Sequence, residues 1–264
     1  MAAMPNAAST EGRIRTERRE HLFIVTIDRP AKYNGFTPEM LDALARAYTE
    51  YEADPALWCL VLLAAGEHFT AGLQLDRFEI DAPLLPRGCV DPLDLVHPRR
   101  TKPVVAAVKG ICFTIGIELM LAADCVVAEA GTRFGQLEVR RGLMAYGGAT
   151  MRMVERAGWG NAMRLLLTGD EFDAATALRL GFVQEVVPEG EGDLRALALA
   201  DTIARQAPLA VRATRHNARV FVEHGTDAAV ADLRAHLSEI AASDDFAEGV
   251  RSFKERRDAV FSGK

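Results

Sequence analysis

Glu118 is an acid set within an apolar run, and this placement makes it the first candidate for chemistry in the chain. Ile115, Ile117 and residues 119–121 around it are all apolar. The simplest interpretation is that an acid in the opening turns of a helix is stabilised by the helix dipole, by about 0.3–1 kcal/mol. A carboxylate in apolar surroundings, however, is normally excluded from them unless it has a partner or a task. We therefore treat Glu118 as a candidate catalytic residue.

A second candidate acid, Glu138, lies in the segment Phe134-Gly-Gln-Leu-Glu-Val139. Taken alone, Glu138 is interpreted as an ordinary surface or salt-bridged acid, with Arg140 and Arg141 as candidate partners. Its interpretation changes only when the surrounding motifs are considered with it.

Several common catalytic motifs are excluded by the sequence. None of the five serines lies in a GxSxG elbow, so a serine hydrolase of the common α/β type is excluded. The chain has no GxxxxGK[ST] phosphate loop and no GxGxxG after a strand, which excludes the usual nucleotide-binding enzymes. The six histidines form no HExxH motif, so we expect no zinc site. The chemistry that remains uses carboxylates, backbone amides or binding alone.

The elements that must position these acids alternate between strands and helices in the first half of the chain. Buried apolar runs predict strands at 22–28, 58–64, 103–108 and 125–128, and helical spacing predicts helices that begin at Pro38 and at Ile115. The stretch with Pro83, Pro86 and Pro92 is predicted to be a loop with short helical pieces. The second half is predicted to be helical at 149–157, 161–167, 174–180, 194–206, 209–223, 226–242 and 246–261.

Composition limits the class of protein further. The 264 residues are 49% apolar and 26% charged, which is enough to build and solvate one large core. A net charge of −6 argues against a nucleic-acid-binding protein, whose contact surface is normally basic. No apolar run reaches the roughly 18 residues of a membrane helix, so no membrane partner is expected. The four cysteines have no CxxC spacing and suggest reduced thiols in a cytoplasmic protein.

Motifs distributed along nearly the whole chain resemble those of the enoyl-CoA hydratase/isomerase (crotonase) superfamily. Each motif is weak alone, but their order and spacing together are highly specific. They are Arg29-Pro30…Asn34, Phe69-Thr-Ala-Gly-Leu-Gln-Leu75, Lys102–Gly110, Glu118…Ala-Ala-Asp124, Phe134–Glu138, Leu167-Thr-Gly-Asp170, Ala177…Gly181-Phe-Val183 and Glu248-Gly…Phe253-Lys-Glu-Arg-Arg257.

This resemblance implies an α/β fold, a crotonase-like spiral of ββα units with a C-terminal helical segment. Residues 1–19 are predicted to form a disordered or frayed tail, 20–200 the α/β core, and 201–264 a helical oligomerisation segment. The assembly implied is a homotrimer or a homohexamer built as a dimer of trimers.

The resemblance also implies an activity, the hydration of the C2–C3 double bond of a 2-enoyl-CoA to a 3-hydroxyacyl-CoA. Hydratases of this family use two glutamates, and the separation 138 − 118 = 20 is the one expected. Glu138 is then the main proton-transfer residue, and Glu118 orients the water. The backbone amides of Leu73 and Ile115 are the implied oxyanion donors. The alternatives are an enoyl-CoA double-bond isomerase, another enolate-forming reaction of the family, or a non-catalytic acyl-CoA binding protein.

The same resemblance assigns binding residues for the acyl-CoA thioester. Ala31, Lys32 and Tyr33 in a turn, with Phe253 and Arg256 in the tail, are the implied contacts of CoA. An alternative interpretation of the tail cations is a solvated helix end. CoA is part of the substrate, and no metal or redox cofactor is implied.

Three positions depart from the common family pattern around the acyl group. Thr114 and Ile115 stand where glycines are common and are expected to narrow the acyl pocket. Tyr146 stands where the family uses a glycine amide to hold water, so its amide is expected to position water and its ring to fill or gate the site. Gly116 is assigned with Tyr146 to this water-positioning or acyl-pocket region.

Overall fold

The structure is a computed structural model that describes residues 11–79 and 83–264. Part of the predicted N-terminal tail, residues 1–10, lies outside the described residues. The rest of that prediction is wrong, because Arg13–Arg19 form a strand, β1, that pairs with the next strand along its whole length. This segment is exposed and rich in arginine, and it lacks the alternation of apolar and polar residues that marks a half-buried strand. The sequence therefore shows no sign of a strand here.

The larger of two sheets has six strands in the order β1-β2-β3-β4-β6-β9. Only the β1–β2 pair is antiparallel, and the other pairs are parallel. All six residues of β3 are buried, as expected for a parallel strand covered on both faces. The strands after β1 are β2 (Leu22–Asp28), β3 (Cys59–Ala64), β4 (Val104–Val108), β6 (Cys125–Glu129) and β9 (Glu185–Val187).

A second sheet of three short strands, in the order β5-β7-β8, was not predicted from the sequence. Its strands are β5 (Ile111–Phe113), β7 (Arg133–Gly135) and β8 (Phe172–Asp173), each too short to show a strand periodicity. In the parallel β5–β7 pair, Phe113 lies opposite Gly135. The segments that follow these two strands therefore leave the sheet side by side.

Helices cover both faces of the large sheet. The helix α1 (Pro38–Ala53) packs on the face that carries Phe23 and Val25, and α6 (Gly192–Ala204) packs on the face that carries Ile24 and Val61. The other core helices are α2 (Ile115–Ala122), α3 (Ala149–Ala157), α4 (Trp159–Thr168) and α5 (Ala174–Arg179), with 3-10 turns η1 (Pro30–Lys32), η2 (Leu75–Arg77) and η3 (Glu138–Arg141). The α/β class predicted from the sequence is confirmed.

No helix in the described part of the chain has the length and apolar character of a membrane span.

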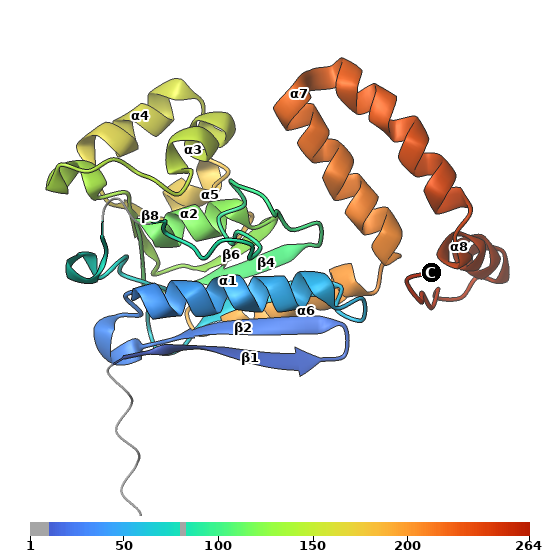
Figure 1. The fold of residues 1–264 in the computed structure, drawn as a ribbon, viewed down its shortest axis with the longest axis horizontal. Helices are drawn as coiled ribbons and strands as arrows, with labels where there is room; N and C mark the ends of the chain where they lie inside the picture. Colours follow the sequence, from blue (N-terminus) through green and yellow to red (C-terminus); the bar gives the residue numbers. More distant parts are fainter. Residues whose placement is uncertain (1–10, 80–82) are drawn as a thin grey trace, which may run out of the picture.

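The C-terminal helices extend away from the sheets (Figure 1). Helix α7 (Pro208–Ala241) is interrupted at Gly225, whose φ of 82° and ψ of −177° are non-helical. We call residues 208–224 the first arm of α7 and residues 226–241 the second arm. The prediction of separate helices at 209–223 and 226–242 is thereby confirmed.

The last helix, α8 (Asp244–Glu255), ends before the predicted residue 261. Arg256 takes a left-handed conformation, and the chain then folds back so that the carboxylate of Glu248 accepts hydrogen bonds from Arg257 and from the Val260 amide.

Ion pairs fasten the first arm of α7 to the core. Arg215 contacts Asp124 at 2.9 Å and Asp94 at 3.0 Å, and Arg219 also pairs with Asp94. A groove of about 810 Å³ lies between this arm and the core, and neither Glu118 nor Glu138 lines it.

Candidate active site

Glu118 lies in α2, a helix whose eight residues are all buried, and the residue is 4% exposed. Its Oε1 accepts hydrogen bonds from the backbone N–H groups of Gly147, at 2.5 Å, and Ala149, at 3.3 Å. Ala149 is the first residue of α3, so the carboxylate satisfies amides at the start of a neighbouring helix. Dipole compensation within its own helix is therefore not the whole role of Glu118.

The surroundings of Glu118 raise its pKa to about 7. Burial is the largest cause, and the negative charge of Glu138 adds to it. The two backbone hydrogen bonds and the positive charge of Arg152 act in the opposite direction. A carboxyl group with this pKa can hold or release a proton near neutral pH, which an ordinary surface glutamate cannot do.

Glu138 begins η3, which is separated from β7 by two residues, and its Oε1 accepts a hydrogen bond from Nε2 of Gln136 at 3.1 Å. Burial raises its pKa. Arg140, one of the two salt-bridge partners considered for it, instead pairs with Asp170 at 3.0 Å. Glu138 follows β7 and Glu118 follows the paired strand β5, so the two acids lie on neighbouring segments, and the charge of Glu138 acts on Glu118.

Two buried oxygens at this site have no hydrogen-bond partner among the residues that the structure describes. They are Oε2 of Glu138 and Oε1 of Gln136. A buried polar atom left without a partner costs about 1–3 kcal/mol, so such atoms mark a place where a bound molecule can be held.

The 70–73 loop lies beside the start of α2. Thr70 pairs with β5 through hydrogen bonds to Ile111 and from Phe113, each 3.0 Å long. A side chain at Gly116 would come within 2.7 Å of Thr70 Cγ2, so this glycine permits the close contact between the loop and the helix. Because of this contact, the loop that contains Leu73 lies next to the helix start that contains Ile115.

Neither predicted oxyanion amide, that of Leu73 or that of Ile115, donates to the backbone hydrogen bonds of the strand or helix in which it lies. The Phe36 amide donates to Gly72 and the Gln74 amide donates to Phe36, so the N–H of Leu73, between them, points to the opposite side. Ile115 is the first residue of α2, where an N–H has no acceptor within the helix.

Thr114, just before α2, has φ 50° and ψ −114°, a conformation that normally requires glycine. Its N–H donates to Gly135 on β7, at 2.9 Å, and its carbonyl accepts from Ile117 and Glu118. The β-branched residue noted in the sequence thus adopts the backbone of the glycine that is common at this place, with about 1–3 kcal/mol of strain.

Tyr146 is 74% exposed, and it is the amide of Gly147, not that of Tyr146, that bonds to Glu118. A Cβ at Gly147 would lie 2.5 Å from Oε2 of Glu118, so the turn before α3 depends on this glycine. Sequence reasoning missed Gly147, although the Gly147-Gly148 pair before a helix was a usable signal. Water positioning by Tyr146 stays a prediction.

The five predicted CoA contacts fall into two groups at opposite ends of the chain's fold (Figure 1). Ala31, Lys32 and Tyr33 lie in and after η1, where β2 leads into α1. Phe253, 85% exposed, and Arg256 lie at the end of α8, beyond α7. One chain therefore does not bring the two groups together.

Comparisons with known proteins agree with this architecture. The sequence profile of the family described as Enoyl-CoA hydratase/isomerase matches residues 17–264. The chain is 35% identical over 258 residues to Enoyl-CoA hydratase EchA19 of Mycobacterium tuberculosis, covering 94% of this chain and 96% of that protein. It is 30% identical to 2,3-dehydroadipyl-CoA hydratase of Escherichia coli, covering 94% and 97%.

A solved structure gives the same result. The crystal structure of a probable enoyl-CoA hydratase/isomerase from Mycobacterium abscessus matches with a TM-score of 0.92 and 47% identity, covering 95% of this chain and 98% of that one. The fold class expected from the sequence motifs is confirmed.

Proposed function

The chain belongs to the enoyl-CoA hydratase/isomerase family, and from this premise we propose that it adds water across the C2–C3 double bond of a 2-enoyl-CoA. The product is a 3-hydroxyacyl-CoA. Family membership makes it an enoyl-CoA hydratase-like enzyme. The observation that carries the specific reaction is the pair of glutamates in one site, one of them buried with a pKa of about 7.

The hydrogen bonds of the two acids support different roles for them. Oε1 of Glu118 is fixed by two backbone amides, so this residue holds and polarises the attacking water. Oε2 of Glu138 has no partner among the described residues and is the atom available for proton transfer. The water oxygen adds to C3, its proton passes to Glu138, and Glu138 protonates C2, which balances the addition of one water molecule.

Negative charge that develops on the thioester oxygen is stabilised by the amides of Leu73 and Ile115. Removal of one such donor from an enzyme typically costs about 10²–10³-fold in turnover. The positive end of α2 adds to the effect at Ile115. The reaction as proposed requires no metal or redox cofactor, because the thioester itself accepts the developing charge.

The separation of the predicted CoA contacts supports an assembled enzyme. Phe253 and Arg256 of one chain reach CoA bound at residues 31–33 only if that CoA is held by a neighbouring copy. We propose a homotrimer, alone or paired as a hexamer, in which α8 completes the CoA site of another subunit.

Double-bond isomerisation is the second candidate, and one observation favours it. Oε1 of Glu118 is held by two backbone hydrogen bonds, whereas Oε2 of Glu138 is buried and has no hydrogen-bond partner among the described residues, so Glu138 is the acid better placed to carry a proton alone. Moving a proton between two carbons of an enolate requires one such acid and the same amides.

A labelling experiment distinguishes the candidates. The protein is incubated with a panel of 2- and 3-enoyl-CoA esters in ¹⁸O water, and the products are followed by mass. Uptake of one labelled oxygen supports hydration, and rearrangement without label supports isomerisation. Tight binding of the esters with no turnover contradicts both reactions and leaves an acyl-CoA binding protein.

A further inference from the structure

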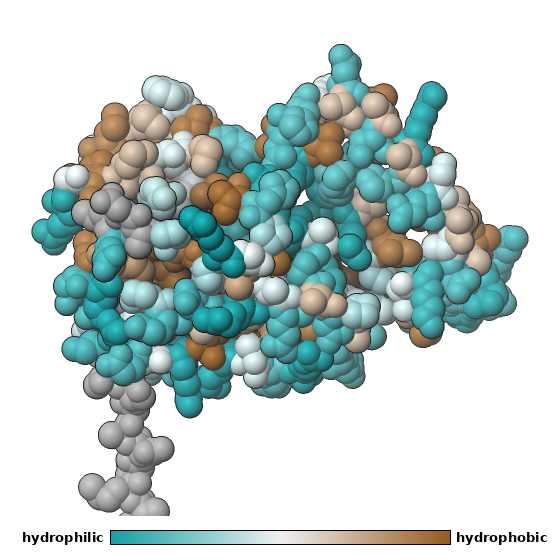
Figure 2. Space-filling model, viewed as in Figure 1, coloured by the Kyte–Doolittle hydropathy of each residue, from teal (hydrophilic) through white to brown (hydrophobic). Residues whose placement is uncertain are grey.

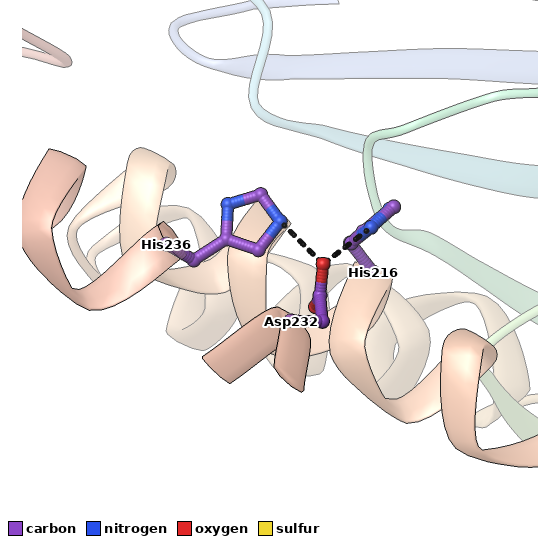
Figure 3. A group of neighbouring side chains, drawn as sticks. All are labelled: His216, Asp232 and His236. Carbon is purple, nitrogen blue, oxygen red and sulfur yellow. Dashed lines mark ion pairs between the residues drawn. The ribbon is translucent and has the colours of Figure 1, made fainter. Parts of the chain in front are cut away.

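The fold of α7 brings two histidines and an aspartate together at a place remote from the glutamates. His216 lies on the first arm, and Asp232 and His236 lie one turn apart on the second arm (Figure 3). Their candidate ligand atoms all lie within 4.8 Å of one another. Spacing along the sequence did not predict this group, because the turn at Gly225 separates its members.

Two of the three distances within the group match those of a metal site. Nε2 of His216 lies 3.3 Å from Oδ1 of Asp232, and Nε2 of His236 lies 3.4 Å from the same oxygen. In a tetrahedral zinc site with bonds of about 2.0–2.1 Å, neighbouring ligand atoms are separated by about 3.3–3.4 Å. Two sides of the triangle therefore already have the length required by a shared ion.

The residues behind these ligands are arranged to support them. Asn217 donates hydrogen bonds to Oδ2 of Asp232 at 2.9 Å and to the Ala229 carbonyl at 2.8 Å, which aligns the two arms. Nδ1 of His236 faces a carboxylate oxygen of Glu239 at 3.7 Å. This distance is too long for a hydrogen bond, but it places a carboxylate beside the ring nitrogen on which metal-binding histidines usually have a hydrogen-bond partner.

We propose that His216, Asp232 and His236 bind one divalent transition-metal ion, with zinc the best match, and that the ion ties the two arms of α7 together. Two imidazoles and one carboxylate suit zinc rather than calcium or magnesium, which prefer oxygen ligands. Three protein ligands leave the fourth tetrahedral position for water. The proposal is independent of the reaction proposed above, since none of these residues belongs to that site.

Zinc titration of the full-length protein, free of any histidine tag, tests the proposal. We expect one zinc ion per chain by calorimetry, with affinity at least about tenfold lower in Asp232→Asn and His236→Ala, and a smaller loss in Glu239→Gln. His224→Ala is the matched control, an exposed histidine next to the turn and outside the group, and should bind as the unaltered chain does. Absence of zinc uptake, or equal uptake in all variants, would overturn the proposal.

A second measurement needs no variant and so does not depend on their folding. X-ray absorption at the zinc edge of the loaded, unaltered protein should show two imidazole nitrogens among about four ligands. A shell of oxygen ligands alone contradicts the site.

Discussion

Glu118 is a residue whose surroundings oppose its own ionisation. Burial and the charge of Glu138 raise its pKa, while the amides of Gly147 and Ala149 favour the carboxylate. No salt bridge to an arginine or lysine is present among the described residues, although Arg152 acts at longer range. The amide oxygen of a glutamine could accept the same two backbone hydrogen bonds without ionising, so the structural role of Glu118 does not by itself require an acid.

Substitution of either glutamate by glutamine should lower turnover at least about a hundredfold, because positioned proton transfer contributes roughly 10²–10⁴-fold. Steady-state kinetics of Glu118→Gln and Glu138→Gln with the best enoyl-CoA ester measure this loss. Glu155→Gln, an exposed acid of α3, is the matched control and should keep normal rates. Near-normal turnover in either active-site variant would remove that glutamate from the mechanism.

The raised pKa of Glu118 also predicts how the free energy of unfolding depends on pH. The folded chain binds this proton with a pKa of about 7, against roughly 4.3 in the unfolded chain. Between these values the folded state holds more protons, so stability falls as the pH rises through this window, by about 4 kcal/mol in total. Glutamine does not ionise and avoids this loss.

Urea denaturation at pH 5 and pH 8 measures the effect. Relative to the unaltered chain, Glu118→Gln should be about 3 kcal/mol more stable at pH 8 than at pH 5, whereas Glu155→Gln should show no such difference. Parallel stability curves for the unaltered chain and Glu118→Gln would show that Glu118 is not protonated in the folded state near neutral pH.

At the scale of elements, the small sheet explains why two distant acids meet. Because Phe113 and Gly135 lie opposite each other in the β5–β7 pair, α2 and η3 start from the same edge of that sheet. The sequence predicted the long buried strands and the helices well, since the continuous apolar runs of the strands and the helical spacing of apolar residues extend over five or more residues. It did not predict the strands of two or three residues, whose pairing is decided by tertiary contacts. Glu118 was predicted from its apolar surroundings and its pairing with Glu138 from a resemblance, but the reason for their convergence was not predicted.

The turn that precedes α3 holds Glu118 through the Gly147 amide, and it can do so only because Gly147 has no side chain. In Gly147→Ala the new Cβ would lie 2.5 Å from Oε2 and 2.8 Å from Cδ of Glu118, a buried side chain that has little room to move. The turn must shift, which should destabilise the fold by about 1–3 kcal/mol and lower turnover by up to about 10²-fold.

Gly160→Ala is the matched control for this substitution. Gly160 lies in α4, and a Cβ added there would have no atom within 4 Å, so alanine should stabilise the chain by about 0.5–1 kcal/mol and leave turnover unchanged. Denaturation midpoints and kinetics of both variants provide the comparison, and equal effects of the two would exclude a specific contact with Glu118.

At the scale of the whole molecule, the C-terminal helices expose more apolar surface than an isolated chain needs. Apolar residues gather on the surface over α4 and between the C-terminal helices (Figure 2). On the second arm of α7, Val230, Leu233 and Leu237 are exposed at a spacing of three and four residues, which places them on one helix face. A contiguous apolar face of this kind is typical of a protein–protein interface.

If this face joins copies of the chain, a charge within it should separate them. Leu237, 65% exposed in the single chain, would be buried at the interface, and Leu237→Glu would place an unpaired carboxylate there. Light scattering should then show monomers where the unaltered chain forms trimers or hexamers, while Ser238→Glu, an exposed neighbour outside that set, should leave the assembly intact. Because Phe253 and Arg256 are proposed to serve a neighbouring subunit, the monomeric variant should also bind CoA esters more weakly. If the variant becomes monomeric but binds CoA esters with unchanged affinity, the proposal of a CoA site shared between subunits is contradicted. Only the proposal that this face is an interface would then stand.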